Sequence, residues 1–261
     1  MPDEAWRVLR AIDTAFGDVL QINAETRAAL QSYYLQAMEG TDPIGFVDIG
    51  WVGNIQRLFC NSLPDATARD RIVGLYLGQL PSCTFNEARG IRMNSFLTRG
   101  RYREPVQKAL HKGGLELLEF AMTADHGTTT SLTQDAAGKI SPVLETPSQE
   151  EAEYARKAVK VQDGMERFLD EHAYLLDHFD LATLAAPHWG LPLLELIESP
   201  TPEQIDALAS LTHSDALGTN AERLPLVTRL SGWKRYSPSH RRSARETSYW
   251  KSAFDHLLHR R

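Results

Sequence analysis

A short apolar run that ends in an aspartate and a glycine turn constrains this chain most. Residues 44–49 read IGFVDI, a run typical of a strand buried in a parallel sheet. Gly50 and Gly53 follow, and then a helical pattern over residues 54–63. A second apolar run, residues 71–77, closes at a glycine. Strand, helix and strand in this order predict a βαβ unit. We therefore expect an α/β fold with a small, mainly parallel, Rossmann-like sheet flanked by helices.

The rest of the chain is predicted to be mostly helical. A hairpin is expected from strands at residues 128–134 and 139–144, joined by the turn Asp135–Gly138. Ser148 and Glu151 have the spacing of a capping box, and Thr201 before Pro202 is a second helix start. Residues 81–103 are expected to form a loop, and everything after residue 181 to be helical or irregular. Helices are predicted at residues 3–16, 25–39, 104–124 (weakened by Gly113 and Gly114) and 148–178.

Length and composition indicate a globular protein of one or two units. The chain has 261 residues, of which 42% are hydrophobic and 24% charged, enough to bury a sizeable core. We predict an α/β domain over residues 1–180 and a helical extension over residues 181–261. The N-terminus has no signal-peptide pattern, no apolar run approaches the length of a membrane span, and only two cysteines occur. These features predict a cytoplasmic protein without a transmembrane segment.

The charge of the chain is unevenly distributed. Residues 233–261 carry eight Lys and Arg against two acidic residues, so this tail is +6 while the formal charge of the chain is −6. A basic tail can meet nucleic acid, anionic lipid, an acidic partner or the acidic body of its own chain. We expect no nucleic-acid binding, because the acidic body would repel phosphates and no nucleic-acid-binding motif is present.

Asp48 and the turn after it are the first candidate site. In open α/β sheets ligands bind outside the carboxyl ends of strands, and free N–H groups at a helix start attract phosphate. Asp48 is predicted as a catalytic residue, which could accept from a ribose or sugar hydroxyl, orient a nucleophile or act as a general base. The turn also has a structural interpretation, as a tight bend followed by a helix cap and a core tryptophan. The residues predicted to bind the ligand are Gly50, Trp51, Gly53, Asn54 and Gln56.

The second candidate site lies at the start of the predicted hairpin. His126 stands in a turn rich in hydroxyl groups, where it could protonate a leaving group or contact phosphate. Glu116 and Glu119 lie on one face of the preceding helix and could form an acid/base pair or a solvated surface. A histidine in such a turn can equally make a local hydrogen bond. We predict Glu119 and His126 as catalytic residues and Gly127 and Thr128 as ligand-binding ones.

The remaining residue patterns are less informative about a functional site than these two segments. The arginines of the predicted loop could neutralise a diphosphate or form ordinary surface. They are Arg89, Arg92, Arg99, Arg101 and Arg103. The other histidines lack metal-ligand spacing, and neither an HExxH motif nor a G-x-S-x-G elbow occurs. We predict no metal centre and no cofactor.

The first candidate site also carries a resemblance to a known family. Residues 46–56, FVDIGWVGNIQ, resemble the DIGW-G-x-x-Q segment of large bacterial multidomain proteins described as predicted HAD-superfamily hydrolases. Many of these proteins serve surface-polysaccharide biosynthesis beside glycosyltransferase domains. Further similar segments follow in the same order, so the resemblance covers about residues 25–180. They are GLYLG at residues 74–78, LELLE at 115–119, His126-Gly127-Thr128, Pro142-Val143 and the long helix after Ser148.

The resemblance implies a role in surface-polysaccharide biosynthesis, but not the phosphatase activity of the family. The DxDx[TV] nucleophile motif of HAD phosphatases is missing from this sequence, so the chain resembles the region downstream of a HAD domain. It implies a glycosyltransferase-like or glycosyltransferase-associated domain that binds a nucleotide-sugar or phosphosugar at the Gly50–Asn54 turn. An upstream HAD or glycosyltransferase domain is the implied partner. The alternative is a non-catalytic scaffold that docks on a polysaccharide-synthesis enzyme through its basic tail.

Overall fold

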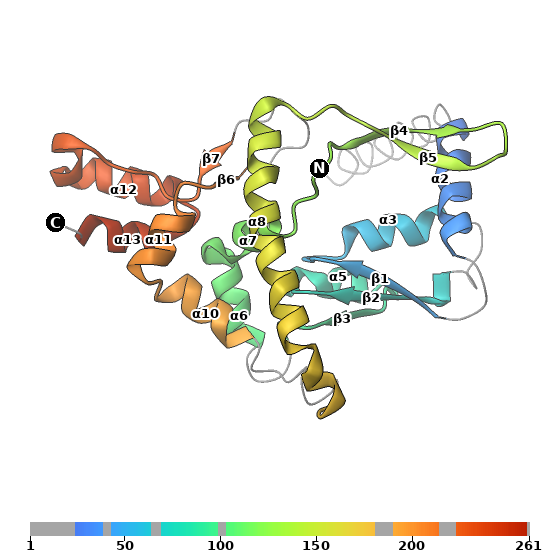
Figure 1. Ribbon diagram of the computed structural model, residues 1–261, viewed down its shortest axis with the longest axis horizontal. Helices are drawn as coiled ribbons and strands as arrows, with labels where there is room; N and C mark the ends of the chain where they lie inside the picture. The colour runs from blue at the N-terminus through green and yellow to red at the C-terminus, as the bar shows by residue number, and fades with distance from the viewer. Residues whose placement is uncertain are drawn as a thin grey trace, which may run out of the picture.

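Three parallel strands form the predicted sheet (Figure 1). The computed structural model describes residues 24–38, 43–63, 69–98, 103–180, 190–213 and 223–259. The strands β1 (Ile44–Asp48), β2 (Ile72–Tyr76) and β3 (Met93–Ser95) pair in the order β1-β2-β3. The mixed α/β class and the small parallel sheet are confirmed. The predicted helix at residues 3–16 lies outside the described residues.

The third strand corrects the prediction of a loop over residues 81–103. That stretch contains a 3-10 turn η1 (Pro81–Cys83), a short helix α5 (Thr84–Glu87) and β3. The sequence Met-Asn-Ser has no β-branched run, so its local strand propensity is low. It pairs because β2 offers an open edge, where Gly74 lies opposite Met93.

Helices cover one face of the sheet. The helix α3 (Asn54–Ser62) buries Phe59 and Cys60 against Ile72. The helix α2 (Ala24–Ala37) packs on α3, where Tyr34 meets the Phe59 ring edge-on at 4.4 Å between centroids. Both helices lie close to their predicted ranges.

The opposite face of the sheet is open among the described residues. Side chains alternate along a strand, so Val47, Leu75 and Phe96 point away from α3. Val47 is 80% exposed, and the three side chains line a hollow of about 740 Å³ together with Met122. Parallel sheets are usually covered on both faces. Within the described ranges, no helix covers this face at Val47, which is 80% exposed.

The predicted hairpin is confirmed. The strands β4 (Thr129–Gln134) and β5 (Ile140–Leu144) are antiparallel and joined at the Asp135–Gly138 turn. The hairpin is anchored on α2, because the Gln36 amide donates to the Gly138 carbonyl at 3.2 Å.

The predicted helix at residues 104–124 is broken at its glycines. It consists of α6 (Arg103–Ala109), a π-helical turn η3 (Leu110–Gly114) and α7 (Leu115–Ala121). Gly113 has φ 116°, a conformation that favours glycine. A Cβ at Gly113 would also lie 3.0 Å from the backbone of Trp250. The break in the helix therefore allows Trp250, in the C-terminal part of the chain, to pack against Gly113.

The long helix is confirmed, with the predicted capping box at its start. It comprises α8 (Gln149–His172) and a 3-10 extension η4 (Ala173–Asp177). Its first half packs on α7, where Tyr154 meets the ring of Phe120 at 5.1 Å.

The C-terminal part is helical except for two short strands, which the sequence did not predict. β6 (Thr212–His213) and β7 (Leu224–Pro225) pair antiparallel. The remaining elements are α10 (Leu191–Glu198), α11 (Pro202–Leu208), η6 (Gly232–Tyr236), α12 (Pro238–Thr247) and α13 (Lys251–His259). The capping box of α11, from Thr201 to Gln204, follows the helix start predicted there.

One large core joins this C-terminal part to α7 and α8. Trp250 and Phe254 are buried together with Leu117 and Ala158. The predicted domain boundary at residue 180 thus falls between two segments that share a core, and the boundary itself stays a prediction. Within the described ranges, no helix combines the length and the apolar character that a bilayer crossing requires.

Candidate functional site

Trp51 connects the turn after β1 to the helix α7. Its indole Nε1 donates to Glu119 Oε1 at 2.8 Å. The Trp51 ring lies against Gly78, where a Cβ would come within 2.8 Å of the indole. Trp51, from the first candidate site, is therefore hydrogen-bonded to Glu119, from the second, although the two residues are 68 positions apart.

The other oxygen of Glu119 faces a histidine. His213 Nε2 lies 3.7 Å from Glu119 Oε2, and the His213 side chain is only 13% exposed. The imidazole packs edge-on against the Tyr249 ring at 5.3 Å. This pair provides a carboxylate and a titratable imidazole in contact, a combination suited to proton transfer.

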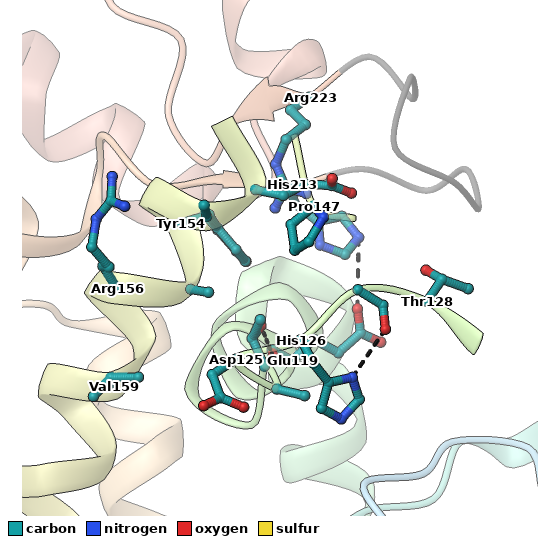
Figure 2. Close-up of a pocket in the computed structure, with 16 residues that line it drawn as sticks. Glu119, Asp125, His126, Thr128, Pro147, Tyr154, Arg156, Val159, His213 and Arg223 are labelled. Atoms are coloured by element: carbon teal, nitrogen blue, oxygen red, sulfur yellow. Dashed lines mark hydrogen bonds and ion pairs between the residues drawn. The ribbon is translucent and has the colours of Figure 1, made fainter. Parts of the chain in front are cut away.

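Glu119 and His213 line a pocket of about 440 Å³ (Figure 2). The pocket lies between the end of α7, the first turns of α8, the loop before β4 and the β6–β7 pair. In Figure 2 Glu119 lies between His213 and His126. Gly127 and Thr128 also line it, so four of the predicted site residues meet here.

Two arginines supply positive charge to this pocket. Arg223 stacks over the Tyr154 ring at 3.9 Å and donates to Thr212 Oγ1 and to the Thr212 carbonyl, both at 3.2 Å. Arg156 projects from the exposed side of α8. Guanidinium groups suit bidentate binding of phosphate. Three carboxylates, of Glu119, Asp125 and Glu151, line the same pocket.

His126 and Gly127 form the rim of the pocket through local contacts. His126 is exposed, and its Nδ1 lies 2.9 Å from the Gly127 carbonyl. A Cβ at Gly127 would overlap the Glu145 carbonyl oxygen, which explains why glycine occupies this position. The local hydrogen bond allowed by the sequence is present, and the imidazole still faces the pocket.

Asp48 lies outside this pocket. It is half-buried at the end of β1, where it lines the hollow on the open face of the sheet together with Val47. Its Oδ1 accepts from the Gly50 N–H at 3.4 Å, and its Oδ2 has no hydrogen-bonding partner among the described residues. Burial raises the pKa of the Asp48 carboxyl, and the N–H groups of Gly50 and Ile49 oppose that rise.

Asp48→Asn is expected to stabilise the protein at neutral pH. A carboxyl whose pKa is higher in the folded chain costs stability when it is ionised. That cost is complete above the folded pKa and disappears below the unfolded value of about 3.9. The melting temperature of the variant should therefore exceed that of wild type at about pH 7, with the difference shrinking toward about pH 4. A variant less stable than wild type at neutral pH would refute this interpretation.

The turn that opens α3 makes its polar contacts with the protein itself. Gly53 is buried with φ 82° at the cap position. Asn86 donates to the Val52 carbonyl at 2.9 Å and to Asn54 Oδ1 at 3.1 Å. These contacts favour the structural interpretation of Asn54 and Gly53.

Gln56 of α3 is fully buried where the helix packs on β2. It accepts from the Tyr76 hydroxyl at 2.8 Å and donates to the Arg92 carbonyl at 3.1 Å. Both ends of its amide have protein partners, so its role in the observed fold is to tie α3 to β2 and to the residue before β3.

Three of the five loop arginines belong to the described residues, and two of them, Arg89 and Arg92, lie near each other. Arg89 stacks on Phe85 at 3.9 Å. Arg92 and Arg89 line a separate hollow of about 420 Å³ with Arg69, near the start of β2. Arg103 begins α6. Arg99 and Arg101 lie outside the described residues.

Twelve of the sixteen residues that line the pocket were not predicted as site residues, among them Tyr154, Arg156, His213 and Arg223. These four come from segments far from the predicted motifs, and no short spacing pattern joins them. Within the described ranges, no three His, Cys, Asp or Glu side chains gather as a metal-binding group. Comparisons of the chain with protein-family models and with curated proteins found no match.

Proposed function

We propose that the pocket around Glu119 binds the phosphate part of a nucleotide-sugar or phosphosugar. The chain would then be a glycosyltransferase-like or glycosyltransferase-associated domain of bacterial surface-polysaccharide biosynthesis. The Trp51–Glu119 hydrogen bond carries this proposal, because it joins the two segments that resemble the polysaccharide-biosynthesis family. Under this proposal the ligand would bind beside α7 rather than at the Gly50–Asn54 turn.

The chemistry follows from the charges of the pocket. Arg156 and Arg223 would bind the phosphate oxygens and stabilise the negative charge of a departing diphosphate. Glu119 would accept a proton from an attacking sugar hydroxyl, and His213 beside it would share that proton. Trp51 fixes one oxygen of Glu119, which leaves the other for this role.

Two broader features fit the proposal. The strand order β1-β2-β3 and the helix α3 between the first two strands support our proposal that the sheet is Rossmann-like. Cys60 and Cys83 are buried free thiols, which fits a reducing compartment such as the cytoplasm.

Arg156→Met is expected to weaken ligand binding about 10- to 100-fold, the value of one charge-assisted contact. Isothermal titration calorimetry with nucleoside diphosphates, nucleotide-sugars and hexose phosphates would measure it. Arg167→Met is the matched control, because Arg167 is exposed on the same helix three turns away and does not line the pocket. Saturable binding that Arg156→Met leaves unchanged would contradict the proposal, as would a wild type that binds none of the ligands.

Glu119→Gln separates binding from catalysis. Glutamine keeps an acceptor for the Trp51 indole but cannot take a proton. The variant should retain nucleotide-sugar binding and lose release of the nucleoside diphosphate. If wild-type protein binds without such release, the transferase-associated form of the proposal holds.

The scaffold is the second candidate function, and the open apolar face of the sheet favours it. Val47 is 80% exposed and Leu75 is 45% exposed, and both line the hollow on this face, which is the kind of apolar surface that other proteins cover. This face, rather than the basic tail, would then dock on a polysaccharide-synthesis enzyme. A flat response to every ligand in the titration would favour this function.

A further inference from the structure

Two exposed surfaces of this chain have complementary chemistry. The first is the distal face of α8, which we define as Met165, Phe168, Leu169 and His172. These positions fall on one side of a helix. All residues from 163 to 171 are exposed, and Leu169 is 65% exposed. Within the described part of the chain, this half of α8 thus presents an apolar stripe to solvent.

Acidic residues surround the distal face. They are Asp163, Glu166, Asp170 and Glu171, against the single cation Arg167, and none of the ion pairs between described residues involves them. An apolar stripe with a negative border is suited to a partner that is apolar at its centre and basic at its edge.

The second surface is an aromatic-basic patch at η6 and the start of α12. We define it as Trp233, Tyr236, Lys234, Arg241 and Arg242. Trp233 is 68% exposed and Tyr236 is 78% exposed. Residues three apart in a 3-10 helix eclipse, so the two rings project on the same side. His240 of α12 meets the Trp233 ring edge-on at 4.8 Å, which brings the arginines of α12 beside the aromatic pair.

The patch has the composition of an interface centre. Tryptophan, tyrosine and arginine are the residues that dominate binding energy between proteins. Residues 232–242 contain four Lys and Arg and no acidic residue, so the patch is strongly positive. It therefore has both properties that the distal face of α8 requires in a partner.

The two surfaces cannot meet within one molecule. In Figure 1 α12 lies at the left end of the longest axis, whereas the distal half of α8 points downward below the sheet. We propose that the distal face of α8 binds the aromatic-basic patch of a second copy of this chain. Because the two surfaces differ, the contact is head-to-tail and continues beyond a dimer or closes as a ring.

The test uses two surface variants of the full chain. Phe168→Glu with Leu169→Glu removes the distal face, and Trp233→Ala with Tyr236→Ala removes the patch. All four side chains are exposed, so both variants should fold, which circular dichroism checks. Sedimentation velocity should show concentration-dependent association of wild type, weakened at about 0.5 M salt. Each variant alone should associate at least about 10-fold more weakly.

Mixing the two variants gives the decisive result. One retains an intact patch and the other an intact distal face, so the mixture should form a heterodimer and nothing larger. Val47→Glu, on the open face of the sheet, is the control and should associate like wild type. A monomeric wild type, a mixture that stays monomeric, or association lost only in Val47→Glu would overturn the proposal. So would a monomer whose patch binds single-stranded nucleic acid.

Discussion

Trp250→Ala is expected to lower the free energy of unfolding by about 3–5 kcal/mol, the usual cost of emptying a buried aromatic site. Trp250 is completely buried at the centre of the large core. Its indole donates to the Ile197 carbonyl at 3.0 Å, so the substitution also leaves a buried acceptor without its donor. Urea unfolding followed by circular dichroism would measure the loss.

The matched control for this prediction is Trp233→Ala. Trp233 is 68% exposed, so its removal should change stability by no more than about 0.5 kcal/mol. If both variants unfolded at the same urea concentration as wild type, the core assigned to Trp250 would be wrong.

Gly127→Ala is expected to destabilise the protein by about 1–3 kcal/mol, as overpacking does, and to deform the pocket. The added Cβ would overlap the Glu145 carbonyl oxygen and lie 2.8 Å from the carbonyl carbon. Both are backbone atoms next to the first pair of the hairpin, where Glu145 N donates to the Thr128 carbonyl. The chain must shift at the pocket rim, so phosphate-ligand affinity should fall together with stability.

Gly164→Ala is expected to stabilise the protein, whereas Gly127→Ala destabilises it. Gly164 lies inside α8, and a Cβ added there would meet nothing within 4 Å apart from the backbone of its own helix. Alanine favours a helix by about 1 kcal/mol over glycine. This variant should melt higher than wild type, whereas Gly127→Ala melts lower. Equal melting temperatures for the two variants would contradict the assigned contacts.

Local signals in the sequence predicted the elements that depend on neighbouring residues. The strand–turn–helix from Ile44, the hairpin around Asp135–Gly138 and the capping box at Ser148 all have short, physically defined patterns. The pattern also indicated the weak point at Gly113, where the helix breaks. Each of these features is decided within a few residues of the chain.

The rest depends on contacts between distant segments. β3 exists because β2 has a free edge, which no property of Met93–Ser95 indicates. The pocket needs Glu119 and His213, which lie 94 positions apart and meet through tertiary packing. The sequence identified Glu119 and His126 as candidates, but it could not show that Trp51 would bond one of them while Asp48 remained apart.

The described residues form three buried clusters of unequal size, and the smallest, Leu97, Val106 and Leu110, packs against Trp51. This inequality has a consequence for how the molecule opens. Among the described residues, the main cluster beside the sheet contains five buried side chains, whereas the helical core contains fifteen. The part of a protein with the fewer apolar contacts loses its structure at the lower free energy. If the sheet opens first, Trp51 loses its packing against the cluster of Leu97, Val106 and Leu110, and its hydrogen bond to Glu119 breaks while α7 is still folded. The Glu119 carboxylate is therefore held in its orientation only while the sheet remains folded.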